Sequence, residues 1–553
     1  MSPPSSASST AAEVDDDDNE TSRSLRASPL SLWRCYVACL FASAATGFAY
    51  SFSTYCDALG RRLHIGIDDL DTISSVAYSA GFLTFLAGLS KEKFGCRRVV
   101  FAGGFVFTAS LAVRYVVAAV LPPESWSVAA MSILTFVNGV FGSPMITAVA
   151  YTLTLRLYPN HGGLMVGIMK SWLGLFSGAA SEIFAGLILR ADPGNGPKTL
   201  LYLLFGAAFV FLCTVLVSPF ILEDTKIDIP PRDCKTRNPP RKHVIFLLAL
   251  LTLMCALIAA SVFSSYVPGG TLHITLASLL AISYIMPLVT CIAPCGMLPA
   301  QPENNDNLPL TRPLIANAAA DEALILAADE KTLLGGLSLG KVLLLPHAWV
   351  FLFVCTAVLG CGMFFINNGS LMCDSANLSS DLNTTMGGII SIAQAIGRLV
   401  AGIASDWGIR RGMPRPVFLL FITAAAGLSH ALLLLGQSRG LFLTSAAFAG
   451  ASFGAIWPMM VLLISDFFGS AHHSANYSFF NGVSAAAGTL LFAKLLPQTV
   501  YDSHSVGGSR CEGRACFFDS HLVCVAACVI AFAFSLWLVW KTRHLDAYRK
   551  CHN

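Results

Sequence analysis

Long apolar blocks separated by short polar segments run along most of the chain. A helix needs about 20 mostly apolar residues to cross the hydrocarbon core of a bilayer, because no water is present there to bond its backbone. Fourteen blocks meet this length, and each is predicted as a membrane-spanning helix. They cover residues 33–57, 70–90, 98–121, 126–153, 162–190, 198–222, 244–264, 273–295, 346–368, 384–405, 416–436, 440–465, 474–497 and 521–541.

Two of these blocks carry the same face pattern, one in each half of the chain. In each, small and polar residues recur at steps of 4, 3, 4 and 4, end on an acidic residue, and pass into a short basic turn. A helix face that is repeated in this way indicates a duplicated membrane-embedded unit. The first copy consists of Ala77, Gly81, Thr84, Gly88 and Glu92, and the second consists of Ser391, Ala395, Arg398, Gly402 and Asp406.

Composition agrees with a chain that is embedded in a bilayer. Hydrophobic residues make up 55% of it and charged residues only 12%, and the mean hydropathy is +0.66. A soluble domain cannot hide this much apolar surface in its core. The predicted fold class is therefore an all-α polytopic membrane protein, whose partners are the lipid bilayer and a small solute and do not include nucleic acid.

Basic residues are unevenly distributed between the loops. With a cytosolic N-terminus, the 35 Lys and Arg residues divide into roughly 24 in cytosolic segments, 7 in outer segments and 4 within spans, as the positive-inside tendency requires. Both termini are therefore predicted to be cytosolic. The predicted segments are a disordered tail (1–28), an N-terminal six-helix bundle (29–222), a basic linker (223–243), an extra transmembrane hairpin (244–295), a cytosolic loop (296–345), a C-terminal six-helix bundle (346–541) and a cytosolic tail (542–553).

Three Asn-x-Ser/Thr sequons fall in the predicted outer loop between the ninth and tenth spans. They begin at Asn368, Asn377 and Asn383, where glycosylation is expected. The sequons at Asn19 and Asn476 face the cytosol in this topology. Within the cytosolic loop, Asp329, Leu333 and Leu334 have the spacing of an acidic dileucine sorting signal, although a plain amphipathic helix fits equally well. Such a signal implies a sorting adaptor and an endosomal or lysosome-like membrane, as an alternative to the plasma membrane.

Most of the 17 cysteines lie within spans, where a free Cys behaves as a small apolar residue. Cys511 and Cys516 fall in the last outer loop and are predicted to form a local disulfide. A metal site there with His504 or His521 lacks a recognised ligand spacing, so no metal is predicted. No P-loop, dinucleotide fingerprint, zinc-protease helix or nucleophile elbow is present, which argues against an enzyme and against a cofactor.

Ionisable residues inside spans are functional candidates by default, because lipid makes them costly. Lys494 and Arg114 lie near the outer ends of their spans, where snorkelling accounts for them. Lys170 could pair within the bundle or bind an anion, and Arg398 could bind an anion or anchor the turn at Asp406. Glu182 could bind a proton or substrate or make a structural hydrogen bond. It belongs to a stripe of small residues that should face another helix: Gly163, Gly167, Ser171, Gly174, Gly178, Glu182 and Gly186.

The stretches from Gly88 to Arg98 and from Gly402 to Arg411 resemble the cytosolic signature loop of the major facilitator superfamily. Glu92 stands where Asp is usual, and the second copy has its glycine displaced by one position. The resemblance implies two six-helix bundles, here with an extra central helix pair, whose inward gate is locked by these loops. The implied gate residues are Gly88, Glu92, Gly95, Arg97, Arg98, Gly402, Asp406, Arg410 and Arg411.

Several short segments are similar to the nodulin-like branch of that superfamily, which itself resembles the monocarboxylate-transporter group. Members of the branch tend to carry an extra helix pair between the two halves, as residues 244–264 and 273–295 would here. The segments that carry the resemblance are 47–52, 158–163, 167–170, 173–175, 453–458 and 467–469.

Secondary transport by alternating access is the function that the resemblance implies. Tyr50 and Tyr55 are predicted to line the pathway together with Lys170, Glu182 and Arg398. The excess of bases over acids within the spans favours a small organic anion or amino acid, with proton coupling. Two alternatives are an iron exporter, with His430 and scattered cysteines as ligands, and a non-transporting nutrient sensor that signals through its cytosolic loop.

Overall fold

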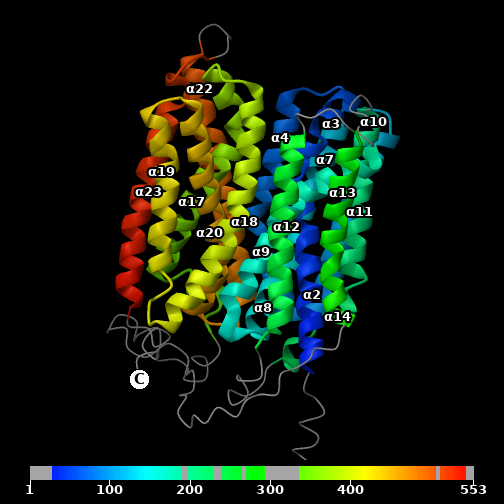
Figure 1. The fold of residues 1–553 in the computed structure, drawn as a ribbon, viewed down its shortest axis with the longest axis vertical. Coiled ribbons are helices and arrows are strands. Elements are labelled where there is room, and N and C mark those ends of the chain that lie inside the picture. The colour runs from blue at the N-terminus through cyan, green and yellow to red at the C-terminus, as the bar shows by residue number, and fades with distance from the viewer. Residues whose placement is uncertain are drawn as a thin grey trace, which may run out of the picture.

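The computed structural model describes residues 28–189, 196–227, 238–264, 270–292, 336–505 and 511–543, and this part of the chain is almost entirely helical (Figure 1). Within it, thirteen helices are long and apolar enough to cross a membrane. A fourteenth span consists of Asp68–Leu83 and Phe85–Phe94, which are bent by 47° relative to each other. The predicted all-helical, multi-pass membrane fold is confirmed.

The N-terminal half forms one bundle of six spans. The chain runs up and down through it, and breaks occur at Gly, Pro and short polar turns, where a helix cannot continue. Its helices are α2 (Pro29–Ala45), α4 (Ile67–Ser79) with α5 (Phe85–Phe94), α6 (Cys96–Tyr115), α7 (Ser127–Val137) with α8 (Ser143–Leu157), α9 (Gly162–Phe184) and α11 (Leu201–Val210), and the short α3 (Cys56–Leu63) and α10 (Gly196–Thr199) lie between spans.

The C-terminal half forms the second bundle, beside the first (Figure 1). The start of α2 and the end of the last helix both lie at the lower end of the molecule in this view. The helices of this half are α16 (Leu339–Val342), α17 (Pro346–Ser375), α18 (Ser380–Arg410), α19 (Val417–Leu435), α20 (Arg439–Phe468), α21 (His473–Gly488), which continues through a π-helical segment (Thr489–Leu495) into α22 (Leu496–His504), and α23 (Ala515–Thr542).

The extra hairpin is formed by α12 (Arg241–Ser264), α13 (Gly270–Ile285) and the short α14 (Val289–Ile292). Both long helices pack against α9, and α12 also contacts α18 of the other bundle. At the lower end, the indole nitrogen of Trp33 donates a hydrogen bond to the hydroxyl of Thr290, 2.9 Å away. The hairpin is therefore attached to the N-terminal bundle on the side where α9 meets α18.

One predicted loop is wrong. The outer loop expected at 369–383 is only residues 376–379, because α17 extends to Ser375 and α18 begins at Ser380. Asn368 consequently lies inside α17, where its amide nitrogen donates to the carbonyl oxygens of Phe364 and Ala493. Asn383 lies in α18, and Asn377 alone of the three sequon residues is exposed in the turn.

Of the remaining predictions for loops and tails, the structure describes the disulfide but not the sorting signal. A disulfide joins Cys511, in the segment before α23, to Cys516 in the first turn of α23. The sorting residues Asp329, Leu333 and Leu334 lie outside the described residues, as do most of the predicted tails and of the 296–345 loop. Their predicted roles stay predictions.

Candidate functional site

A cavity of about 540 Å³ lies between the two bundles. Its walls are the middle and upper parts of α4, α8 and α9 from one half and of α17, α18 and α21 from the other. The lower ends of α5, α9, α18 and α21 contribute nothing to its lining. The cavity therefore occupies the upper half of the molecule and ends where the bundles meet below it.

The cavity is basic. Arg114, Lys170 and Arg398 line it, and its described lining contains no Asp, Glu, His or Cys. Three cations without an acidic partner give a low-dielectric space a strongly positive potential. This environment suits an anionic solute and opposes a metal cation.

Arg398 reaches from α18 across to α9. Its side chain is buried, and Nη2 donates to Oε1 of Gln394 at 3.0 Å, whereas Nε and Nη1 have no hydrogen-bond partner among the described residues. A Cβ atom on Gly174 of α9 would lie 1.2 Å from Nη1, so the missing side chain provides the space that the guanidinium fills. Because burying an unpaired donor of a cation is costly, this group is suited to bind a ligand acceptor.

Lys170 forms the floor of the cavity. Its Nζ donates to the hydroxyl of Tyr477 at 2.7 Å and lies 3.9 Å from the ring centroid of Tyr151 and 5.0 Å from that of Trp457. Aromatic faces stabilise a cation where no carboxylate is available. Since Lys170 belongs to α9 and Tyr477 to α21, this contact also links the two bundles.

Tyr50 and Tyr55 both line the cavity, and their role in a transport pathway stays a prediction. Tyr55 is buried and its hydroxyl accepts a hydrogen bond from Nη1 of Arg114 at 3.2 Å, while Nε of Arg114 has no hydrogen-bond partner in the described part of the chain. The snorkelling interpretation of Arg114 is wrong, because its side chain is buried and lines the cavity. The sequence does contain a signal, because steps of 3 and 4 place Arg114 on the same helix face as Phe107 and Ser110. In the structure all three residues are buried.

Glu182 lies outside the cavity lining. Its carboxylate accepts a hydrogen bond from the hydroxyl of Ser261 on α12, the first helix of the extra hairpin. The small-residue stripe of α9 does face another helix as expected, because Cβ atoms on Gly163 and Gly167 would meet the backbone of α18. At Gly186 the stripe turns toward α13 instead. This placement favours the structural alternative for Glu182.

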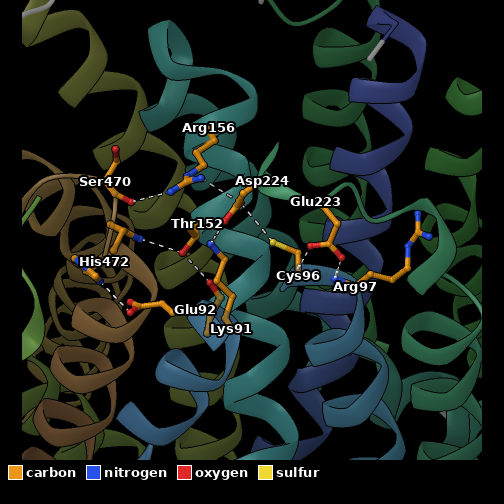
Figure 2. Close-up of polar contacts among 12 residues, drawn as sticks. Lys91, Glu92, Cys96, Arg97, Thr152, Arg156, Glu223, Asp224, Ser470 and His472 are labelled. Atoms are coloured by element: carbon orange, nitrogen blue, oxygen red, sulfur yellow. Dashed lines mark hydrogen bonds and ion pairs between the residues drawn. The ribbon is translucent and has the colours of Figure 1, made fainter. Parts of the chain in front are cut away.

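The first signature loop closes the lower end of the molecule against α21 (Figure 2). Oε2 of Glu92 lies 2.9 Å from Nδ1 of His472, the residue before α21. On the other side of the loop, Lys91 forms an ion pair with Asp224, which also pairs with Arg156 at 3.3 Å. The loop is thus joined to both bundles at once.

Glu223 fixes the start of α6 in the same region (Figure 2). Its carboxylate oxygens accept hydrogen bonds from the backbone N–H groups of Cys96 at 2.7 Å and Arg97 at 3.0 Å. An acid at a helix N-terminus satisfies donors that the helix leaves free. Gly95 precedes them with a φ of 82°, which residues with a side chain rarely adopt. A Cβ atom there would also lie 2.7 Å from Glu223, so the signature position needs glycine for its backbone conformation and for the space it leaves.

The second signature loop closes the lower end against α9. Oδ1 and Oδ2 of Asp406 accept hydrogen bonds from the backbone N–H groups of Gly163 at 2.9 Å and Leu164 at 2.8 Å, the first residues of α9. Arg415 lies 3.5 Å from Asp406 and 2.6 Å from Asp466. Asp406 therefore caps a helix of the opposite bundle and also pairs with Arg415 of its own bundle.

The duplicated small-residue face explains how the bundles approach so closely. A Cβ on Gly88 would lie 2.4 Å from the carbonyl oxygen of Ser474, and one on Gly402 would lie 2.2 Å from that of Gly163. Thr84 of the same face donates to the carbonyl oxygen of Ser478 at 2.7 Å. Each copy of the repeat is therefore the contact surface between its own bundle and the fifth span of the other.

Some predicted gate residues do not take part in these contacts. Arg98 and Arg410 are exposed, and the guanidinium of exposed Arg411 lies 4.1 Å above the ring of Trp407. Arg97 donates to the carbonyl oxygen of Pro219 within its own half. The sequence interpretation missed the residues that pair with the loops instead: Arg415, Asp466, His472, Glu223 and Asp224.

A smaller link joins the bundles at the upper end. Nζ of Lys494 lies 2.7 Å from a carboxylate oxygen of Asp71 and also donates to the hydroxyl of Ser75. Lys494 belongs to the span formed by α21 and α22, and Asp71 belongs to α4. Snorkelling alone therefore does not account for Lys494, which bridges the upper part of the two halves.

Comparison with known proteins identifies the type of chain. A family model described as Nodulin-like matches residues 32–293. Over these residues, somewhat less than half of the chain, the protein is similar to the Nodulin-like family. No curated protein sequence matches the chain. The structure of the proton:xylose symporter XylE bound to 6-bromo-6-deoxy-D-glucose superposes on this chain with a TM-score of 0.54 at 11% identity, over 92% of this chain and 96% of the other. The chain therefore has the major facilitator fold.

A second similar structure is a bacterial homologue of the human drug peptide transporters PepT1 and PepT2. Its TM-score is 0.48 at 11% identity, over 93% of this chain and 99% of the other. The nodulin-like match includes the extra hairpin up to residue 293. The nodulin-like resemblance drawn from the sequence is supported by the family model over residues 32–293, and the fold that the superfamily resemblance implies is confirmed.

Proposed function

We propose that this protein is a secondary transporter that carries a small organic anion across a membrane by alternating access. The observation that carries the proposal is the cavity between the bundles, lined by Arg114, Lys170 and Arg398 and by no described acid. In folds of this kind the substrate binds near the bilayer midplane, and the two bundles rock around it. The two free nitrogens of Arg398 provide the fork that a carboxylate or similar anion requires.

The closed lower end and the cavity in the upper half correspond to one end point of such a cycle. Loops rich in Lys and Arg lie at the lower end, which we therefore place in the cytosol. The conformation is then outward-facing, with its cytosolic gate closed by Glu92 and Asp406. Opening that gate, together with closure over the upper cavity, would release the anion to the other side.

Iron export has less support from the site. The described lining holds no Asp, Glu, His or Cys, which are the side chains that iron prefers as ligands. Proton coupling through Glu182 also lacks support, because that residue contacts the hairpin rather than the cavity. The sensor hypothesis rests on residues 296–345, of which only 336–345 are described.

Binding measurements on the purified full chain test the proposal. Acetate, lactate, pyruvate and succinate serve as anionic probes, lactamide as a neutral probe and Fe²⁺ as a cationic one, with thermal unfolding as the readout. We expect at least one anion to raise the unfolding midpoint and the neutral and cationic probes to leave it unchanged. Stabilisation by Fe²⁺ or lactamide but by no anion would overturn the assignment.

Variants then connect binding to the site. Arg398→Gln should weaken the stabilising anion about ten-fold or more, since a hydrogen bond to a charged group contributes about 1.5–3 kcal/mol. Arg439→Gln is the matched control, because Arg439 is exposed at the start of α20 and does not line the cavity. Uptake of the same anion into proteoliposomes should fall in parallel in Arg398→Gln and persist in the control.

A further inference from the structure

A second cluster of reactive side chains lies inside the C-terminal bundle, away from the cavity. Each of its five residues is buried, with at most 5% of its surface exposed, and none of them lines the cavity. They come from three different helices, α17, α19 and α23. The cluster consists of Cys361, His430, His521, Cys524 and Cys528.

The sequence places three of these residues on one face. His521, Cys524 and Cys528 follow one another at steps of 3 and 4, which is one stripe of α23. This stripe packs against α17 and α19, where it meets Cys361 and His430. Helix periodicity and the bundle geometry together gather the thiols and imidazoles at one point.

The distances in the cluster match those of a metal site. The ligand atoms of Cys361, His430 and Cys524 all lie within 4.8 Å of one another, and Sγ of Cys361 lies 3.6 Å from Sγ of Cys528. In a tetrahedral zinc site with Zn–S bonds of about 2.3 Å, two sulfur ligands are about 3.8 Å apart. The sulfur atoms of Cys361 and Cys528 are therefore already at about the spacing that a shared zinc ion requires.

His430 is oriented as a metal-binding histidine would be. Its Nε2 lies 3.3 Å from the carbonyl oxygen of Cys361, which can only accept, so Nε2 carries the proton. The electron pair of its Nδ1 then accepts a hydrogen bond from Nδ1–H of His521 at 2.9 Å, and an ion that binds Nδ1 replaces this hydrogen bond. Metal-binding histidines commonly donate their second N–H to a carbonyl or carboxylate in this way.

One member of the cluster also borders a small pocket at the upper end. His521 also lines a shallow pocket, together with Gln437, Arg514 and Phe518, among others. Its imidazole is therefore positioned between this pocket and His430.

We propose that Cys361, His430 and Cys524 bind one thiophilic metal ion, Zn²⁺ or Cu⁺, with Cys528 as the fourth ligand. Sulfur and imidazole donors select such ions over Mg²⁺, Ca²⁺ and Mn²⁺. Each thiol that becomes a ligand releases its proton to solvent, so three thiolates and one neutral imidazole surround the ion, and the site carries a net charge of −1 with Zn²⁺. The ion ties α17, α19 and α23 together and is not the transported solute.

The test measures metal content directly. The full chain is purified in detergent with a thiol-preserving reductant, incubated with Zn²⁺ or with Cu⁺, freed of excess ion and analysed by mass spectrometry for metal. We expect about one ion per chain for at least one of the two metals. Competition between Zn²⁺ and Cu⁺ on the same sample then identifies which ion the site prefers.

Ligand variants distinguish this site from adventitious binding. Cys361→Ser and His430→Gln should each lower the bound metal at least about ten-fold, and Cys355→Ser should keep it. Cys355 is the matched control, because it is buried on the same helix as Cys361 and lies outside the cluster. Should Cys361→Ser aggregate on size-exclusion chromatography, His430→Gln alone decides the point.

Spectroscopy provides a second readout. Co²⁺ in place of Zn²⁺ should give the wild-type chain and Cys355→Ser a thiolate-to-cobalt absorption band that Cys361→Ser lacks. Substoichiometric metal in the reduced wild type would overturn the proposal. Equal metal content in wild type and in both ligand variants would overturn it as well.

Discussion

The two signature loops occupy equivalent places in their halves yet close the lower end by different contacts. Asp406 contacts the start of α9, and Glu92 contacts the residue before α21. Each of these two helices is the fifth span of the opposite half. The side chain of Asp406 is 5% exposed and accepts hydrogen bonds from two backbone N–H groups. That of Glu92 is 22% exposed and contacts the side chain of His472.

The duplication determines where each acid lies but not how strongly it holds the opposite bundle. The position of each acid and its glycine follows from the shared repeat, because both copies place them on the helix face between the bundles. The strength of each contact depends on local partners. A buried carboxylate that caps a helix gains from the helix dipole and from charge-assisted bonds, whereas an exposed pair with an imidazole is screened by water.

The lower end should therefore open unevenly. Separating α18 from α9 removes a buried carboxylate from two N–H donors, and separating α5 from α21 breaks a more exposed contact. We expect the α5–α21 side to loosen first and the α9–α18 side to act as the stronger lock. The predictions below test this asymmetry.

Asp406→Ala should have the largest effect. It leaves the first turn of α9 uncapped and Arg415 without one of its two carboxylates, and breaking a buried pair costs about 3 kcal/mol or more. The closed lower end should become a minor state. Electron–electron distance measurements between non-cysteine spin labels at Lys93 and Arg410 should show a longer main distance than in the wild type.

A control separates loss of the lock from loss of the fold. The unfolding midpoint of detergent-purified Asp406→Ala, with labels placed within one bundle, reports on bundle integrity. If the Lys93–Arg410 distance stays short while the bundles remain intact, Asp406 is not the stronger lock.

Gly402→Ala and Gly88→Ala should each have a large and similar effect. In both, the new methyl group would lie less than 2.5 Å from a backbone atom of the opposite half, and overpacking costs about 1–3 kcal/mol. Both variants should shift the same label pair toward the longer distance. Similar shifts would show that close approach is the symmetric part of the gate. Gly440→Ala, at a site with open space, is the matched control.

The spans and both signature loops could be predicted from the sequence, because apolar length and the glycine, acid and base spacing are local patterns. The hairpin was predictable for the same reason. The loop at 369–383 was not, since polar residues such as Asn368 and Asn383 end a hydropathy scan although they lie in helices. Asn383 faces the cavity, where polar side chains are tolerated within a span.

The candidate site was predictable only in part. Lys170, Arg398 and the two tyrosines were found because charged or aromatic residues within apolar blocks stand out. Glu182 stood out equally, but its environment depends on where α12 packs. Asp406 was found by its motif, whereas its partner Arg415 depends on the turn after α18, which no spacing rule describes.

Glu92→Gln should have a smaller effect than the changes above. The amide still offers His472 an oxygen acceptor, and an exposed ion pair contributes at most about 1 kcal/mol. In Glu92→Gln, the Lys93–Arg410 distance distribution should gain a minor component at longer distance. The same component should appear in the wild type as the salt concentration is raised, because salt screens the exposed pair. A shift as large as that of Asp406→Ala would show that the two locks are equal and would end the asymmetry argument.

Arg411→Gln should have the smallest effect, although the signature resemblance assigns this residue to the gate. Its guanidinium lies over Trp407 of its own helix and is exposed, so the substitution removes about 0.5–1 kcal/mol of cation–π contact within one bundle and nothing between bundles. Anion uptake and the label distance should both match the wild type. Arg415→Gln, measured alongside, should disturb both, because Arg415 holds the carboxylates of Asp406 and Asp466 in place. If instead Arg411→Gln opens the lower end and Arg415→Gln does not, the gate follows the family motif rather than the contacts of this chain.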